Sequence, residues 1–311
     1  MTETTLIIPT RDRPNYLFML LKTVFQQTLP FETVIVSDNS STIEFKEQNK
    51  VKLAPFLEVY GDKLFLIPTP QDFLSDVHTK YIQDNYLGKS KFSVLFHDDD
   101  EMLPHYHETS INALNSRGGI VAVGCNATKL KDMRAICGTV MRQNSGNTII
   151  ETSRELQKHY MRISSTAPPP LCGYLFKTSV LKSISFDSGI GGKYSDVVAL
   201  SEAATFGDLI WLYEPLIRCR SHSGQDSQTV STLGFRSLLN YMINKGEFSK
   251  TSLYVESYRF KHMRLKLKYC FILKKWRSAR IVSQFLIRFL LKNLIWRKQL
   301  YCYLWTLISC K

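Results

Sequence analysis

The stretch Phe92–Pro104, FSVLFHDDDEMLP, is the one around which the rest of the chain is organised. Its first five residues are mostly apolar and bounded by charge, which predicts a buried strand. Three carboxylates follow, Asp98, Asp99 and Asp100, and adjacent like charges are tolerated where they face water or share a cation. Mg²⁺ and Mn²⁺ prefer such oxygens and leave positions for phosphate. The alternative is a solvated acidic turn that caps the following helix.

The residues before this stretch alternate between strand and helix patterns. Thr4–Ile8 and Phe31–Val36 read as strands, and apolar residues at helical spacing predict a helix over Pro14–Gln27 between them. The pattern then repeats as a helix over Ile43–Leu53, a strand over Lys63–Ile67 and a helix over Phe73–Leu87. Such units predict parallel strands with right-handed crossovers, and ligands bind outside the carboxyl ends of such strands.

Polar residues follow three of these expected strands. Arg11 and Arg13 come after the first strand, Asp38 comes at the end of the second, and the Asp triplet comes after the fourth. Because the carboxyl ends of parallel strands meet at one edge, these side chains predict a pocket for a nucleotide and a metal ion. No GxGxxG follows the first strand and no GxxxxGK[ST] occurs, which argues against dinucleotide binding and P-loop chemistry.

Four linked motifs resemble those of the family 2 glycosyltransferases of the GT-A fold. They lie in TLIIPTRDRPNYL, QQTLPFETVIVSDNSS and FSVLFHDDDEMLP, and match PT-x-x-R-P, Q-T-x-P, D-x-S and a DxD followed by proline. Weaker likeness over Pro168–Leu181, Phe186–Leu200 and Glu214–Ser227 extends the match to about residue 228. The resemblance implies an α/β fold, with a Rossmann-like, mostly parallel sheet and helices on both faces.

The resemblance also implies an activity, namely inverting transfer of a sugar from a nucleotide-diphosphate donor, with UDP the preferred nucleotide. It assigns Mn²⁺ or Mg²⁺ to Asp99 and Asp100, where the ion would neutralise charge on the leaving diphosphate. The positions expected to contact the donor are Pro9, Thr10, Arg11, Arg13, Asp38, Asp98, Arg220 and His222. For Asp38, which matches the family carboxylate on uracil or ribose, an Asx-turn cap within SDNSS is the alternative.

Asp196 matches the family's acidic residue at the start of a late helix. The resemblance therefore makes Asp196 the expected base, which would take the proton of the acceptor hydroxyl. A helix N-cap is its structural alternative, and Glu202 is a weaker candidate for the base. The glycine-rich GIGGKYS before Asp196 suits a mobile lid over the substrate.

The sequence departs from the family pattern at two places. His97 stands where many members carry the first aspartate of D-x-D-D, so Asp99 or Asp100 is the expected metal ligand, with Asp98 beside it or on ribose. Many members also carry Arg-Asn on the helix before the DxD strand. Here that helix reads DVHTKYIQDN, in which Lys80 is only a weak substitute for the arginine.

Length and composition are those of a globular protein. With 311 residues, 44% of them apolar, the chain can bury a sizeable core. The first residues show no basic segment followed by an apolar core, so we expect no signal peptide. No stretch of 18 uncharged apolar residues predicts a spanning helix. The seven cysteines form no CxxC and read as thiols in a reducing cytosol, not as disulfides or a zinc site.

Positive charge is concentrated at the end of the chain. Residues 257–311 hold 14 of the 40 Lys and Arg and no Asp or Glu, and the remainder carries a net charge of −1. This asymmetry predicts a GT-A domain over 1–230 and a basic helical region over 231–311. Within that region, IVSQFLIRFLLKNLIW is an amphipathic basic helix with apolar Ile281, Phe285 and Phe289. Arg280, Arg288 and Lys292 follow its other face.

Three roles fit such a region. An anionic membrane surface ranks first, a packing appendage with a solvated charged face second, and nucleic acid last. We therefore expect a cytoplasmic enzyme, peripheral on the cytoplasmic face of the inner membrane.

The leading hypothesis is a metal-dependent hexosyltransferase that acts on a glycan or lipid-linked acceptor in cell-surface polysaccharide synthesis. A sugar-nucleotide nucleotidyltransferase is disfavoured, because no glycine-rich phosphate loop follows the first strand. A catalytically inactive GT-A-like binding protein is the third hypothesis, and the intact Asp triplet and Asp196 argue against it.

Overall fold

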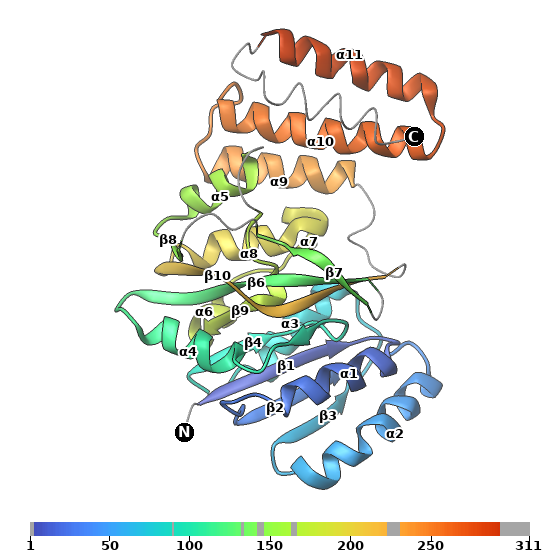
Figure 1. The fold of residues 1–311 in the computed structure, drawn as a ribbon, viewed down its shortest axis with the longest axis vertical. Coiled ribbons are helices and arrows are strands. Elements are labelled where there is room, and N and C mark those ends of the chain that lie inside the picture. Colours follow the sequence, from blue (N-terminus) through green and yellow to red (C-terminus); the bar gives the residue numbers. More distant parts are fainter. Residues whose placement is uncertain are drawn as a thin grey trace.

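The structure is a computed structural model that describes residues 3–292 apart from 89, 132–133, 142–145, 163–166 and 223–230. Within these residues, ten strands form one mixed sheet, and Figure 1 shows helices on both of its faces. The strands are β1 (Thr4–Thr10), β2 (Thr33–Asp38), β3 (Leu64–Pro68), β4 (Phe92–Leu95), β5 (Glu101–Met102), β6 (Ile120–Lys131), β7 (Arg134–Thr139), β8 (Thr148–Ile150), β9 (Tyr174–Lys177) and β10 (Asp208–Ser221).

The helices divide into those that pack on the sheet and a C-terminal stack. The first group is α1 (Pro14–Val24), α2 (Ile43–Tyr60), α3 (Ser75–Asn85), α4 (Tyr106–Asn115), α5 (Ser153–Met161), α6 (Thr178–Ser183), α7 (Ser188–Gly191) and α8 (Ser195–Ala203), with the 3₁₀ turns η1 (Leu171–Gly173) and η2 (Gly192–Tyr194). The stack is α9 (Thr232–Lys245), α10 (Leu253–Ile272) and α11 (Trp276–Lys292). Figure 1 shows the stack at the end of the molecule farthest from α2.

The N-terminal half of the sheet confirms the predicted alternation of strands and helices. Strands β3, β2, β1 and β4 lie side by side in parallel, with Ile8 opposite Val36 and Ile7 opposite Leu95. Strand β1, TTLIIPT, is buried along almost its whole length, as expected of a strand inside a sheet that is covered on both faces. Helix α2 continues past the predicted end to Tyr60, with exposed Pro55 inside it, where water can replace the missing backbone bond.

The second half of the sheet changes direction. Strand β9 is antiparallel to both β4 and β6, while β10 runs parallel to β6, so the sheet is mixed but mostly parallel. The two residues of β5 pair antiparallel with β10, Met102 opposite Ile217 and Glu101 opposite Arg218. This pairing brings the end of β10 beside the Asp triplet. Helix α4 begins later, with His105 at its N-cap, so the interpretation of the triplet as a helix cap is wrong.

The C-terminal helices pack on the body of the protein through α8 and α5. Phe235 of α9 joins Val197 and Val198 of α8 in one buried cluster, and its ring stacks on Tyr258 and His262 of α10. The second half of α10 packs against α11 in a separate cluster of Phe260, Leu267, Cys270, Ala279, Val282 and Leu286. Residues 232–292 of the basic region therefore form a layer of packed helices joined to the body.

The predicted amphipathic helix is α11, and its two apolar rows differ. Val282 and Leu286 face α10 and are buried, whereas Ile281 is exposed. The side chains of Phe285, Arg288, Phe289 and Lys292 lie outside the described residues. Among the described helices, none has both the length and the apolar character that crossing a bilayer needs.

One glycine fixes the glycine-rich loop against α9. Gly192 has φ +59°, and a Cβ there would lie 2.4 Å from Cα of Gly234. We expect Gly192→Ala to lower the free energy of unfolding by about 2–3 kcal/mol, because it adds left-handed strain and a backbone clash. Urea unfolding measures the change. Gly88→Ala, where a Cβ meets no atom within 4 Å, is the control and should change stability by less than about 0.5 kcal/mol. Equal effects would contradict the tight contact.

Candidate active site

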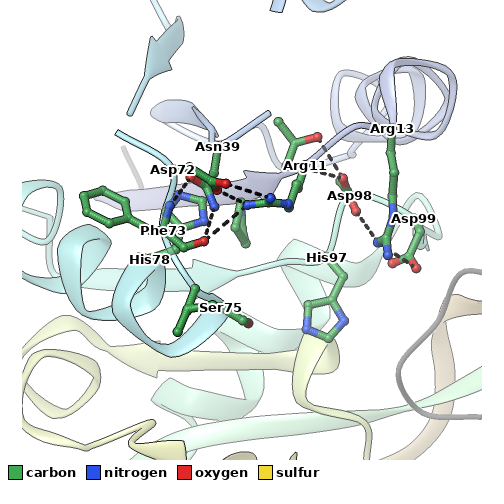
Figure 2. Close-up of a pocket in the computed structure, with 13 residues that line it drawn as sticks. Arg11, Arg13, Asn39, Asp72, Phe73, Ser75, His78, His97, Asp98 and Asp99 are labelled. Atoms are coloured by element: carbon green, nitrogen blue, oxygen red, sulfur yellow. Dashed lines mark hydrogen bonds and ion pairs between the residues drawn. The ribbon is translucent and has the colours of Figure 1, made fainter. Parts of the chain in front are cut away.

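A cavity of about 570 Å³ opens at the carboxyl ends of β1 and β2 and at the turn after β4. Its lining residues are Pro9, Thr10, Arg11, Arg13, Asn39, Asp72, Phe73, Leu74, Ser75, His78, His97, Asp98 and Asp99. Figure 2 shows Asn39, Asp72, Phe73 and His78 at one end, Arg13, Asp98 and Asp99 at the other, and Arg11 between them. The cavity thus lies at the edge of the sheet where the sequence predicts a pocket.

Asp98 joins the end of β4 to the end of β1. Its carboxylate accepts a hydrogen bond of 2.7 Å from Oγ1 of Thr10 and a longer one, 3.4 Å, from the backbone N–H of Arg11. The guanidinium of Arg13 donates to it at 3.0 Å. Burial raises the pKa of Asp98 to about 6, against the opposing effect of Arg13. Asp98 therefore orders the loop that carries both cavity arginines.

Asp99 lies between Arg13 and His222. Its Oδ2 is 3.2 Å from the guanidinium of Arg13 and 2.9 Å from Nε2 of His222. The ring of Tyr16 packs beside His222, with 5.0 Å between ring centroids. A carboxylate oxygen and an imidazole nitrogen this close form a donor pair that Mn²⁺ accepts readily. The residues at this end of the cavity therefore fit a divalent ion.

Asp100 is turned away from the cavity, toward β10. Its Oδ1 accepts the backbone N–H of Arg220 at 2.8 Å, and its Oδ2 lies 3.7 Å from Nδ1 of His97. The guanidinium of Arg220 donates to the carbonyl of Asp99 at 2.8 Å and pairs with Glu101. Asp100 and Arg220 thus hold the acidic turn in shape, and neither lines the cavity.

His97, the departure from D-x-D-D, lines the cavity with a half-exposed side chain. Burial lowers its pKa, but the carboxylates of Asp100, Asp99 and Asp98 together raise it to about 9. His97 is therefore a cation at neutral pH in the metal-free protein. Its position between the acidic turn and α8 gives it a direct electrostatic effect on Asp196.

Asp196 is the second residue of α8, and Tyr194 occupies the N-cap, so the N-cap interpretation is wrong. Burial raises the pKa of Asp196, while a backbone hydrogen bond from Val197 and the charge of His97 lower it. The carboxylate in turn raises the pKa of Tyr194, after burial. Asp196 is thus a half-buried carboxylate within electrostatic range of His97, although it is not among the residues that line the cavity.

Asp38 points into the protein. Its Oδ1 accepts the backbone N–H of Ser40 at 2.9 Å and its Oδ2 accepts from Asn49 at 3.0 Å. This is the local turn that the sequence allows as the alternative to nucleotide binding. The next residue, Asn39, lines the cavity instead, and its side chain bonds both the N–H and the C=O of Phe73.

Six cavity residues were missed by the sequence reasoning: Asn39, Asp72, Phe73, Leu74, Ser75 and His78. Asp72 forms a two-pronged ion pair with Arg11, and His78 bonds Ser37 at 2.8 Å. Burial lowers the pKa of His78 to about 4, so this ring is neutral. The polar stretch PTPQDF, which contains Asp72 and Phe73, could have indicated two of them. It follows β3, and β3 is parallel to β2 and so ends at the same edge of the sheet.

Two weaker candidates lie elsewhere. Lys80 pairs with Asp84 at 2.7 Å and faces a second cavity, of about 400 Å³, shared by α3 and α6. Glu202 accepts the backbone N–H of Ser185 at 2.7 Å, which ties α8 to the loop after α6. Neither lines the first cavity.

The fold is shared with solved structures at low sequence identity. The 1–349 fragment of S. aureus TarS in complex with UDP-GlcNAc has a TM-score of 0.53 and 13% identity, over 90% of each chain. Against the longer TarS structure, the chain spans 43% of that protein's length. The Pyrobaculum calidifontis mannosyltransferase PcManGT, solved with GDP-Man and Mn²⁺, has a TM-score of 0.51 and 15% identity, over 98% of this chain and 85% of that one.

GalNAc-T7, solved with UDP, GalNAc and Mn²⁺, matches with a TM-score of 0.53 and 11% identity, over 84% of this chain and 50% of that one. No family model and no curated protein matches the sequence. The structure therefore has the fold of the GT-A-type glycosyltransferases, with polar residues gathered at the edge of the sheet where the carboxyl ends of its strands meet.

Arg220 should matter for the shape of the acidic turn. We expect Arg220→Gln to lower the free energy of unfolding by about 3 kcal/mol, because it breaks a buried ion pair and leaves the Asp99 carbonyl unpaired. Arg218→Gln is the matched control, since Arg218 pairs with the same Glu101 at 3.1 Å but is 45% exposed. The control should lose less than about 1 kcal/mol. Denaturant unfolding of both variants measures this, and equal losses would contradict the assignment.

Proposed function

We propose that the protein is a metal-dependent, inverting glycosyltransferase that uses a nucleotide-diphosphate sugar, with UDP as the preferred nucleotide. The observation that carries this proposal is the Asp99–His222 pair, 2.9 Å apart: Asp99 lines the end of the cavity that also holds Arg13 and Asp98, and Phe73 lies at the other end. The likeness to TarS, solved with UDP-GlcNAc, supports the choice of donor.

The two ends of the cavity suit the two ends of such a donor. Phe73 offers a ring and Asn39 an amide next to it, which suits a nucleobase. The guanidinium of Arg13 lies at the acidic turn, and that of Arg11 extends toward Asp72 and Phe73; both can donate hydrogen bonds to phosphate oxygens. Asp38 is buried behind this end, so we assign it to positioning Asn39 and not to the base.

Asp99 and His222 would hold the divalent ion. When bound, Mn²⁺ or Mg²⁺ supplies positive charge to the leaving diphosphate. Asp98 holds the backbone of Arg11 and the side chain of Arg13, and so positions the donors for the phosphates. Asp100 positions Asp99 through the turn and is not itself a ligand in this proposal.

Asp196 would take the proton from the acceptor hydroxyl as that oxygen attacks the sugar carbon. Its raised pKa makes it a stronger base than an ordinary aspartate, and Tyr194 and Tyr160 lie close enough for its charge to raise their pKa values. The loop of α7 and η2 lies directly before it, and to close over the acceptor this loop would have to release its contact with α9 at Gly192. We propose a glycan or lipid-linked acceptor used in cell-surface polysaccharide synthesis on the cytoplasmic side.

Metal binding can be tested without turnover. We expect UDP with Mn²⁺ to raise the melting temperature, with a stabilisation of about 2.7 kcal/mol at 100 times the Kd. Asp99→Asn and His222→Ala should each remove the Mn²⁺-dependent part of this shift. Asp84→Asn, on the exposed face of α3, is the control and should keep it. A normal Mn²⁺-dependent shift in both site variants would contradict the metal site.

Asp196→Asn should lower kcat about 100-fold or more and leave UDP binding nearly unchanged. In the wild type, kcat should fall as the pH drops through the raised pKa of Asp196, because the base is then protonated. A raised carboxyl pKa also means that ionisation of Asp196 opposes folding at neutral pH, so the variant should be at least as stable as the wild type. Glu202→Gln is the control. If Asp196→Asn lowered the free energy of unfolding as well as kcat, Asp196 would have a structural role instead.

A further inference from the structure

The turn between α10 and α11 gathers exposed apolar and basic side chains at one tip of the molecule. Four large apolar residues are 57–63% exposed there: Ile272, Leu273, Trp276 and Ile281. Five exposed cations lie among them: Lys268, Lys274, Lys275, Arg277 and Arg280. Residues 257–311 contain no Asp or Glu, so nothing in this segment of the sequence neutralises them. We call residues 268–281 the hairpin tip.

The backbone of the hairpin tip is fixed by hydrogen bonds. Lys274 donates to the C=O of Phe271 and Lys275 to that of Cys270, the two bonds that close a helix end with a left-handed residue. Ala279 then donates to the C=O of Lys275, which starts α11. Leu273 and Trp276 are thus held outward by a well-bonded turn.

The left-handed position is occupied by lysine. Lys274 has φ +52°, where glycine is the residue that avoids strain. A lysine at this place works against the stability of the turn and adds positive charge at its apex. Lys274 is therefore expected to lower the stability of the turn through its backbone strain and to strengthen binding of an anionic partner through its charge.

We propose that the hairpin tip docks the protein on an anionic lipid surface. The cations match the negative charge of such a surface, and the apolar side chains between them can enter the boundary between headgroups and acyl chains. Nucleic acid fits less well, because phosphate would satisfy the cations but leave Leu273 and Ile281 in water. Lipid is the partner that uses both kinds of side chain at once.

The position of the hairpin tip gives docking a purpose. Figure 1 shows the turn between α10 and α11 on the same side of the molecule as the carboxyl ends of β1 and β10, where the first cavity lies. Docking there would turn this side toward the membrane. The advantage, access to a lipid-linked acceptor, rests on the proposed function, whereas lipid binding itself does not.

Vesicle co-sedimentation tests the proposal on the full chain. Vesicles of phosphatidylcholine in which part of the lipid is phosphatidylglycerol should bind the protein at low salt, and pure phosphatidylcholine should bind it weakly. Replacing Lys274, Lys275, Arg277 and Arg280 by Gln should weaken binding by nearly three orders of magnitude, at roughly fivefold per cation. The matched control replaces Lys46, Lys50, Lys52 and Lys63 by Gln and should bind as the wild type does.

The apolar part is tested by the binding that survives added salt, which screens charges beyond about 10 Å at 0.1 M. Leu273→Ser with Ile281→Ser should weaken this remainder at least about tenfold. Val51→Ser with Val59→Ser, on the exposed side of α2, is the control and should have no effect. Lys274→Gly should raise the melting temperature yet weaken vesicle binding about fivefold, a pair of changes that a purely structural role would not produce.

Three results would overturn the proposal. They are absence of binding to anionic vesicles at low salt, equal losses in the hairpin-tip and control variants, and binding of duplex DNA that displaces the protein fully from vesicles. The UDP–Mn²⁺ melting shift is measured on the same variants and should stay unchanged. Loss of vesicle binding with that shift intact concerns the hairpin tip alone, and absence of the shift in the wild type concerns the proposed function alone.

Discussion

Mutual repulsion of Asp98, Asp99 and Asp100 is the constraint around which the site is built. The structure answers it by surrounding each carboxylate with its own set of partners: the β1 loop and Arg13 for Asp98, Arg13 and His222 for Asp99, and the Arg220 backbone for Asp100. These partners come from opposite ends of the sequence. The acidic turn therefore joins the first strand to the last, and the position of β10 depends on it.

This arrangement separates positioning from binding within one short turn. Asp98 and Asp99 line the cavity, whereas Asp100 and Glu101 face the buried guanidinium of Arg220. Asp100 and Glu101 fix the geometry of the turn, whereas Asp98 and Asp99, which also have protein partners, lie where a ligand in the cavity can contact them. Adjacent acidic residues of one turn can therefore serve two purposes, lining the cavity and fixing the shape of the turn.

The sequence was sufficient for the first half of the fold and for part of the site. Apolar strands and one-sided helices are local patterns, so β1 to β4 and the residues that follow them were predictable, including Thr10 and Asp99 at the cavity. Pairing of β5 with β10 was not, because it rests on two residues and on partners more than a hundred positions away. Without that pairing, the sequence placed Arg220 among the residues expected to contact the donor. At Asp38, a shift of one residue decides which side chain faces the cavity, and composition does not fix it.

Packing also connects the proposed base to the proposed lipid surface. Val197 and Val198, next to Asp196, pack on α9, and Phe235 of α9 stacks on α10, whose far end is the hairpin tip. A helix of 20 residues such as α10 spans about 30 Å, enough to extend from its contact with α9 to the side where the strands end. A flexible tether would hold an enzyme near a membrane without orienting it. The packed helices α8, α9 and α10 would instead fix the height and direction of Asp196 above a docked membrane surface. This matters because a lipid-linked acceptor is itself held in the membrane and has little freedom to move toward the base.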